Sequence, residues 1–198
     1  MTVPLPAEAA ADDLSCLNAR RSVPARQLQA PGPDDATLER MLRAAVRVPD
    51  HGKRMPWRFL RIAGNARLAL GEALVARALQ HDPGAGGAMI DKDRQRFAHA
   101  PLVIAVVAKL GADGKIPESE RFSSASCVCF ALLQAAQACG FGAQWLTGWP
   151  AYDAAVAARL GLAANEHVLG FLHLGTASQT APERERPDAM SLLSELAP

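Results

Sequence analysis

The chain has 198 residues, of which 49% are hydrophobic and 21% charged, and its formal net charge at pH 7 is +1. A chain of this length can bury a sizeable core, and so small a net charge provides no broad field for nucleic acid, a membrane surface or an acidic protein. We therefore expect small molecules or further copies of the chain as partners, and neither nucleic acid nor a membrane.

In the first half of the chain, three helices and one strand are predicted. The predicted elements are helices over residues 12–19, from Asp34 to the stop at Pro49, and over residues 65–80, with a strand over residues 59–62. In the first helix Leu14 and Leu17 would face inward. The third would begin with Asn65 as its cap, because an asparagine side chain can accept a free amide of the first turn. Prolines at 24, 31 and 33 favour an extended loop between the first two helices.

In the second half, helices and strands alternate. The predicted elements are a glycine-rich loop over residues 81–87, helices over residues 89–97, 118–139 and 152–160, and strands over residues 101–108, 144–147 and 168–174, the last ending at Gly175. Residues 101–108 are almost continuously apolar and β-branched, which predicts a strand buried on both faces. Gly140 suits the position after the long helix. Small side chains on that helix would let another backbone approach it: Ser123, Ser124, Ala125, Ser126, Ala131, Ala135, Ala136 and Ala138.

Several common sites have no matching pattern. The four cysteines form no C-x-x-C pair and the five histidines form no metal-binding motif, so buried thiols are favoured over zinc or disulfides. No G-x-G-x-x-G or P-loop is present, so any nucleotide-like ligand must be held in another way. Residues 1–13 lack a signal-peptide pattern and the longest apolar run is too short to cross a bilayer, which predicts a soluble, cytoplasmic protein.

Two segments carry candidate binding chemistry. Arg20, Arg21 and Ser22 place two guanidiniums beside a hydroxyl, a combination that suits a phosphomonoester, although such a triplet is usually a solvated basic turn. Residues 47–59 cut a helix at a proline and present His51 on a polar loop before a strand, as ligand sites often do. Taken alone, His51 is better explained as a loop histidine that is hydrogen-bonded to backbone.

Together with two later segments, these resemble the nitroreductase family, in particular its short, minimal branch. The opening R-R-S at residues 20–22 matches, and residues 47–57 are similar to the family's R-x-P-[SD] stretch that ends in P-W. Residues 135–147 resemble its small-residue helix and G-x-G-x-x-W turn, and residues 168–175 resemble its last core strand. Four motifs in the right order cover about residues 14–186.

The resemblance implies an α+β fold, a three-layer α/β/α sandwich with a mainly antiparallel central sheet, in a homodimer with two FMN sites at its interface. Residues 1–198 would form a single nitroreductase-like domain, with a C-terminal arm at 177–198. The activity would be ping-pong hydride transfer from NADH or NADPH through FMN to an electron-poor small molecule, a nitro compound or a quinone. The flavin carries that chemistry, so no protein nucleophile or general base is expected.

The resemblance also assigns roles to individual residues. The R-R-S triplet would bind the FMN phosphate and ribityl end, while Arg47 and His51 would contact the flavin, His51 from across the dimer interface. Trp145, Leu146 and Thr147 would line the flavin, and Arg184 or Arg186 would touch the phosphate. Arg47 and Lys53 are candidates for the cation that stabilises negative charge on the reduced ring.

The chain departs from the family pattern near the flavin, where Leu146 replaces a longer polar residue and Met55 replaces an amide side chain. Other interpretations therefore stay open. The same fold and FMN could serve ene reduction, dehalogenation or flavin breakdown, the protein could bind flavin without catalysis, or it could be an α+β domain without a cofactor. The proline- and charge-rich tail could pack on a partner subunit or stay solvated.

Overall fold

The computed structural model of the chain describes residues 14–197. The helices are α1 (Ser15–Asn18), α2 (Asp35–Ala45), α3 (Asn65–His81), α4 (Gly87–Gln95), α5 (Glu118–Ala138) and α6 (Ala154–Arg159). The strands are β1 (Leu28–Gln29), β2 (Trp57–Ala63), β3 (Leu102–Lys109), β4 (Gly142–Leu146) and β5 (Glu166–Ala177). Four 3-10 turns connect them: η1 (Ala25–Gln27), η2 (His51–Lys53), η3 (Trp149–Ala151) and η4 (Ala189–Leu192).

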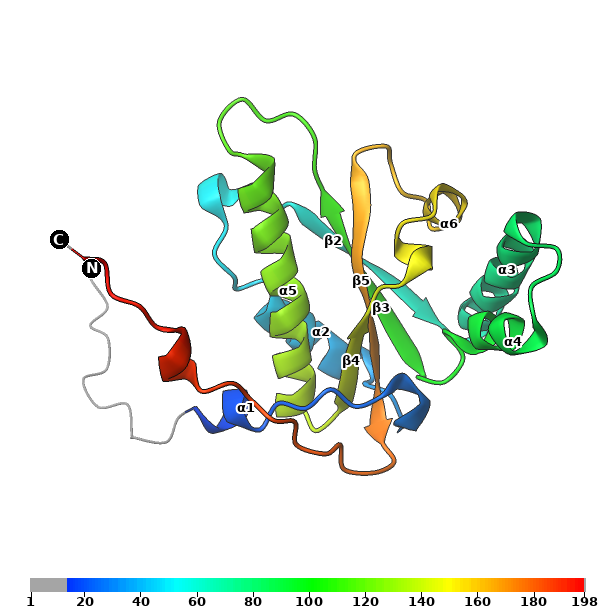
Figure 1. The fold of residues 1–198 in the computed structure, drawn as a ribbon, viewed down its shortest axis with the longest axis horizontal. Coiled ribbons are helices and arrows are strands. Elements are labelled where there is room, and N and C mark those ends of the chain that lie inside the picture. The colour runs from blue at the N-terminus through cyan, green and yellow to red at the C-terminus, as the bar shows by residue number, and fades with distance from the viewer. Residues whose placement is uncertain (1–13, 198) are drawn as a thin grey trace.

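The five strands form one sheet in which β5 occupies the centre (Figure 1). On one side β5 pairs with β3, and β2 pairs with the far side of β3; on its other side β5 pairs with β4 and β1. All four of these pairings are antiparallel. The α+β class with an antiparallel central sheet is therefore confirmed.

Helices cover both faces of this sheet because β3 points alternate side chains in opposite directions. Ile104 and Val106 belong to the core shared with α2 and α5, whereas Val103 and Ala105 belong to the core shared with α3 and α6. Every residue from Leu102 to Ala108 is buried. Burying a large aliphatic side chain stabilises the fold by roughly 1.5–3 kcal/mol, so β3 holds the helices of both outer layers against the sheet. The predicted three-layer sandwich is confirmed.

Several predicted element boundaries need correction. Helix α2 begins near its predicted start, where Asp34 caps it by accepting the amide of Thr37 at 2.8 Å. Asn65, in contrast, lies inside α3: Gly64 is at the cap position, and no side chain there accepts an amide. β5 does not end at Gly175, because Thr176 and Ala177 pair with β1, a strand that local patterns did not predict.

Other elements are present but shifted by a few residues. Helix α2 ends before Pro49, and α4, β2, β3 and β4 differ from their predicted ranges at one or both ends. Helix α6 begins two residues later than predicted, because Asp153 caps it by accepting the amides of Ala155 and Val156. Gly140, with a φ of 81°, does follow α5 as predicted.

Within the described residues, the first helix is shorter than predicted. It is the single turn α1, and Asp12 and Asp13 lie outside the described residues. Leu14 and Leu17 do not face inward as expected but are 62% and 51% exposed in the single chain. Helix α1 lies on the surface beside α5, where Gln137 donates to the carbonyl of Cys16 at 3.0 Å.

The C-terminal tail leaves the body of the protein after one buried contact. Ala181 packs with Val23, Leu28 and Ala100 in a small separate cluster. Beyond it the chain passes α1 and extends away from the sheet (Figure 1), so that several large apolar side chains are exposed: Met190, Leu192, Leu193 and Leu196. In the described part of the chain no helix has the length and apolar character needed to cross a membrane.

Candidate functional site

The R-R-S segment lies at one edge of the sheet, between α1 and η1. Its chain runs beside β4, where Val23 donates its amide to the carbonyl of Ala143 at 3.0 Å. On the helical side, the side chain of Gln137 in α5 accepts the amide of Arg21 at 3.2 Å. The fold thus brings the R-R-S segment next to the strand that leads to Trp145, although the two are far apart in sequence.

The three side chains of the R-R-S segment point to different partners. Arg20 Nη1 lies 3.2 Å from the hydroxyl oxygen of Ser22. Arg21 instead donates to the carbonyl of Asn18 at 2.8 Å and forms an ion pair with Glu183 of the C-terminal arm. No carboxylate in residues 14–197 pairs with Arg20. Arg20 and Ser22 are therefore available to an anion, whereas Arg21 holds the arm.

The arm brings further cations to this edge of the sheet. Glu183 also pairs with Arg186, whose Nη2 lies 3.3 Å from Glu183 Oε1. Arg184 is adjacent in sequence and exposed. The ion pair between Arg21 and Glu183 therefore places both candidate C-terminal arginines in the part of the fold that contains Arg20.

The turn after β4 is held by a buried carboxylate. Asp93 of α4 accepts from Arg96 at 2.8 Å and from the indole of Trp149 at 3.1 Å. Gly148 lies between these groups with a φ of 75°, and a Cβ at that position would stand 2.9 Å from Arg96 Nη1. Helix α4 thus fixes the end of the segment formed by residues 145–147 and places a guanidinium beside it.

The second candidate segment is a tight loop organised by Asp50. Its carboxylate accepts the amides of Arg54 at 3.1 Å and Met55 at 2.8 Å. These bonds stabilise an unusual backbone conformation. Lys53 and Met55 have positive φ values of 52° and 45°, which residues other than glycine seldom adopt. Arg54 also binds Asp113, and together with two backbone amides it holds the pKa of that carboxyl well below its usual range.

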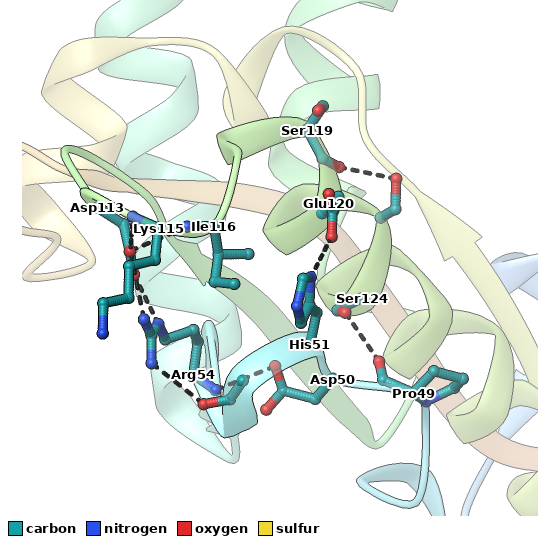
Figure 2. A network of polar contacts seen from close by, with 12 residues as sticks. Pro49, Asp50, His51, Arg54, Asp113, Lys115, Ile116, Ser119, Glu120 and Ser124 are labelled. Atoms are coloured by element: carbon teal, nitrogen blue, oxygen red, sulfur yellow. Dashed lines mark hydrogen bonds and ion pairs between the residues drawn. The ribbon is translucent and has the colours of Figure 1, made fainter.

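His51 lies on this loop facing α5 (Figure 2). Its Nδ1 is 2.7 Å from Oε2 of Glu120, and the hydroxyl of Ser124 donates to the carbonyl of Pro49 at 2.8 Å. These residues border a surface hollow of about 360 Å³. Arg47, two residues after the end of α2, is exposed and forms no ion pair within residues 14–197.

The two candidate segments lie at opposite ends of α5. The R-R-S segment contacts Gln137 near the end of the helix, whereas His51 contacts Glu120 in its first turn. Seventeen residues at a rise of 1.5 Å separate these two positions by about 25 Å along the axis. One chain therefore groups the R-R-S segment with residues 145–147 and the arm, and keeps His51 and Arg47 apart from them.

Sequence reasoning missed the residues that hold these segments in place. Glu120 and Glu183 looked like ordinary surface charges, and Asp93 like part of a polar helix. Asp50 was the most detectable, since an aspartate after a proline at the start of a loop is a common acceptor for nearby amides. The others depend on partners more than 50 residues away, apart from the local pairs Asp93–Arg96 and Glu183–Arg186.

Comparisons with known proteins agree on one family. The model described as the nitroreductase family matches residues 17–176. The chain is 38% identical over 165 residues to a protein of Escherichia coli (strain K12) that carries the name NAD(P)H nitroreductase YdjA, covering 83% of this chain and 88% of that protein.

Solved structures show the same fold at lower sequence identity. A nitroreductase-like family protein from Bacillus cereus superimposes with a TM-score of 0.78 at 20% identity, over 99% of this chain and 98% of that one. A nitroreductase with bound FMN from Bacteroides fragilis NCTC 9343 gives a TM-score of 0.69 at 20% identity, over 95% of this chain and 100% of that one.

Proposed function

The chain belongs to the nitroreductase family, and on that premise we propose that it is an FMN-dependent enzyme that uses NADH or NADPH to reduce an electron-poor acceptor such as a nitro compound or a quinone. The name of the Escherichia coli relative and the FMN bound to the Bacteroides fragilis neighbour support this cofactor pair. The observation that carries the proposal is the Arg20–Ser22 pair, which has two kinds of donor and no competing carboxylate among the described residues.

A terminal phosphate fits this pair. The guanidinium of Arg20 and the hydroxyl of Ser22 can both donate to phosphate oxygens, and charge-assisted bonds of this kind are among the strongest in proteins. Arg184 or Arg186 would add a second cation from the arm, which Glu183 fastens to Arg21. We propose that Arg21 acts on the phosphate through the arm and not by direct contact.

The flavin ring would then extend along the segment formed by residues 145–147. The indole N–H of Trp145 is already donated to the carbonyl of Leu169 at 3.0 Å, so backbone groups and Thr147 are the available partners. When bound, FMN would supply the two-electron chemistry by accepting a hydride from the nicotinamide and delivering it to the acceptor. We expect the nicotinamide and the acceptor to occupy the same place in turn, which gives ping-pong kinetics. Arg96 joins Arg47 and Lys53 as a candidate for the cation that stabilises negative charge on the reduced flavin.

We also propose that two copies of the chain complete each site. The distance of about 25 Å along α5 keeps His51 from the phosphate anchor of its own chain, and a two-fold dimer would bring it to the anchor of the other. The outward face of α5 suits such a contact, because Phe122 and Phe130 are each 46% exposed beside small residues. The apolar residues of the arm offer further surface to a second copy.

The test is the cofactor of the purified protein. We expect a yellow protein that releases FMN, and not FAD, on denaturation. Its visible flavin absorbance should bleach with NADH or NADPH in the absence of oxygen. FAD, or a colourless protein that does not bind added FMN, would contradict the proposal. Bound FMN that neither nucleotide bleaches would favour a non-catalytic flavin-binding protein, which the apolar Leu146 and the occupied indole of Trp145 would suit.

A further inference from the structure

We propose that Glu120 is a positioning residue that fixes the tautomer and the orientation of His51. In this arrangement Nδ1 of the imidazole faces Glu120, and Nε2 is the nitrogen offered to the ligand of the partner subunit. Only the identity of that ligand rests on the function proposed above. The pairing itself is a property of the described chain.

The tautomer follows from hydrogen-bond chemistry. His51 Nδ1 lies 2.7 Å from Oε2 of Glu120. An ionised carboxylate has acceptors only, so the hydrogen between them must be carried by Nδ1. Within residues 14–197, Nε2 of His51 forms no hydrogen bond. It is therefore an acceptor in the neutral ring and a donor in the imidazolium, and in both states it points away from Glu120.

Both partners are held by their own supports (Figure 2). Glu120 is in the first turn of the 21-residue helix α5. The loop of His51 is fastened to the same helix by the bond from Ser124 to Pro49 and is braced internally by the carboxylate of Asp50. A functional side chain whose neighbours are fixed in this way keeps one geometry, which binding and catalysis require.

The pair contributes little to folding, which separates a positioning role from a structural one. The side chains of His51 and Glu120 are 63% and 47% exposed. Exposed ion pairs contribute between nothing and about 1 kcal/mol to stability. Replacing Glu120 should therefore leave the fold intact while releasing the ring of His51 over the hollow beside α5.

The first experiment reads the tautomer directly and does not depend on the flavin. Full-length protein with ¹⁵N-labelled histidine is examined by two-bond ¹H–¹⁵N correlation at about pH 8, with the His51→Gln variant identifying the signals. We expect the Nδ1–H tautomer in the wild type and in Glu120→Gln, whose amide oxygen still accepts. In Glu120→Ala we expect a shift toward Nε2–H. An Nε2–H tautomer in the wild type, or an unchanged spectrum in Glu120→Ala, would overturn the proposal.

The second experiment connects the tautomer to the site. Glu120→Ala should lower kcat/KM about fivefold, the scale of one exposed charge-assisted contact, and Glu120→Gln should restore most of it. Glu118→Ala is the matched control, because it removes another acidic residue from the first turn of α5, and the one side-chain hydrogen bond of Glu118 among the described residues is the one it accepts from the amide of Gly111. Wild-type kcat/KM in Glu120→Ala, despite a changed tautomer, would overturn the positioning role. If the protein bound no FMN, the proposed function would be wrong. The spectra of the first experiment would still decide whether Glu120 sets the tautomer of His51.

Discussion

The indole of Trp145 occupies the space in which a side chain at Gly170 would stand. A Cβ at Gly170 would overlap Nε1 and Cδ1 of the ring. The same Nε1 donates to the carbonyl of Leu169 at 3.0 Å, and Gly170 lies opposite Val106, beside a register shift between β3 and β5. The absence of a side chain at Gly170 in the central strand thus allows Trp145 of β4 to pack, partly buried, against the core.

Gly170→Ala should destabilise the protein, because the methyl group must displace the indole or the backbone. Overpacking of this kind costs typically 1–3 kcal/mol, which we expect in the free energy of unfolding measured in urea. The displaced Trp145 should also weaken FMN binding. Gly114→Ala is the control, since a Cβ there meets nothing within 4 Å. Equal stability of the two variants would show that β4 adapts without cost.

The side chains of the R-R-S segment should differ in their effect on FMN. Arg20→Ala removes a charge-assisted phosphate contact worth on the order of 1.5–3 kcal/mol, so the dissociation constant should rise roughly 10- to 150-fold by fluorescence titration. Ser22→Ala removes a neutral donor and should cost less. An unchanged constant for Arg20→Ala would move the phosphate site elsewhere.

Arg21→Ala should act mainly on the arm. Its guanidinium is paired with Glu183, so its loss should expose the C-terminal segment to limited trypsin cleavage while affinity falls less than in Arg20→Ala. Glu183→Gln is the matched variant and should produce the same cleavage pattern. A dissociation constant as weak as that of Arg20→Ala, with the arm still protected, would mean that Arg21 contacts the phosphate directly.

Subunit mixing tests which chain supplies each group. Suppose that Arg20→Ala and His51→Ala homodimers are each inactive. After joint unfolding and refolding, half of the dimers are mixed, and each mixed dimer has one site with both defects and one with neither, so about a quarter of wild-type activity should return. If one chain supplied both groups, every site would carry one defect, and the mixture would stay inactive although heterodimers had formed.

His173 should make the protein less stable as the pH falls. It is fully buried in β5, and neither ring nitrogen has a hydrogen-bond partner among residues 14–197. Burial lowers its pKa from 6.5 to about 4, with smaller contributions from His99 and Arg96. A depressed histidine pKa means that the unfolded chain binds the proton first. The contribution of neutral His173 to the free energy of unfolding is therefore fully present above pH 6.5 and is lost as the pH falls toward 4. The loss between pH 7.5 and 5.0 is about 2 kcal/mol.

The variant His173→Leu should lack most of this loss, and it should be at least as stable as the wild type at pH 7.5 because no buried nitrogen is left unpaired. Urea unfolding at the two pH values measures both effects. His167→Leu, in the exposed part of the same strand, controls for the loss of one histidine. A pH dependence in His173→Leu equal to that of the wild type would assign the acid sensitivity to other groups.

Features with a short-range cause could be predicted from the sequence. The continuous apolar run of β3 indicated burial on both faces, a helix began near Asp34 as predicted, and Gly140 followed the long helix. Four ordered motifs were enough to predict the family, and the resemblance to that family implied the layered fold. Each of these signals depends on a few neighbouring residues or on their order.

The tertiary structure decided what those residues contact. It paired Arg21 with Glu183, gave His51 the carboxylate of Glu120, and left Leu17 on the surface although its spacing indicated an inward face. Side-chain partners of this kind are separated by many residues, and their meeting depends on how whole elements pack. A local pattern specifies which element forms and which face is apolar, but the carboxylate that reaches a given guanidinium or imidazole is set only when the helices and the arm are placed against the sheet.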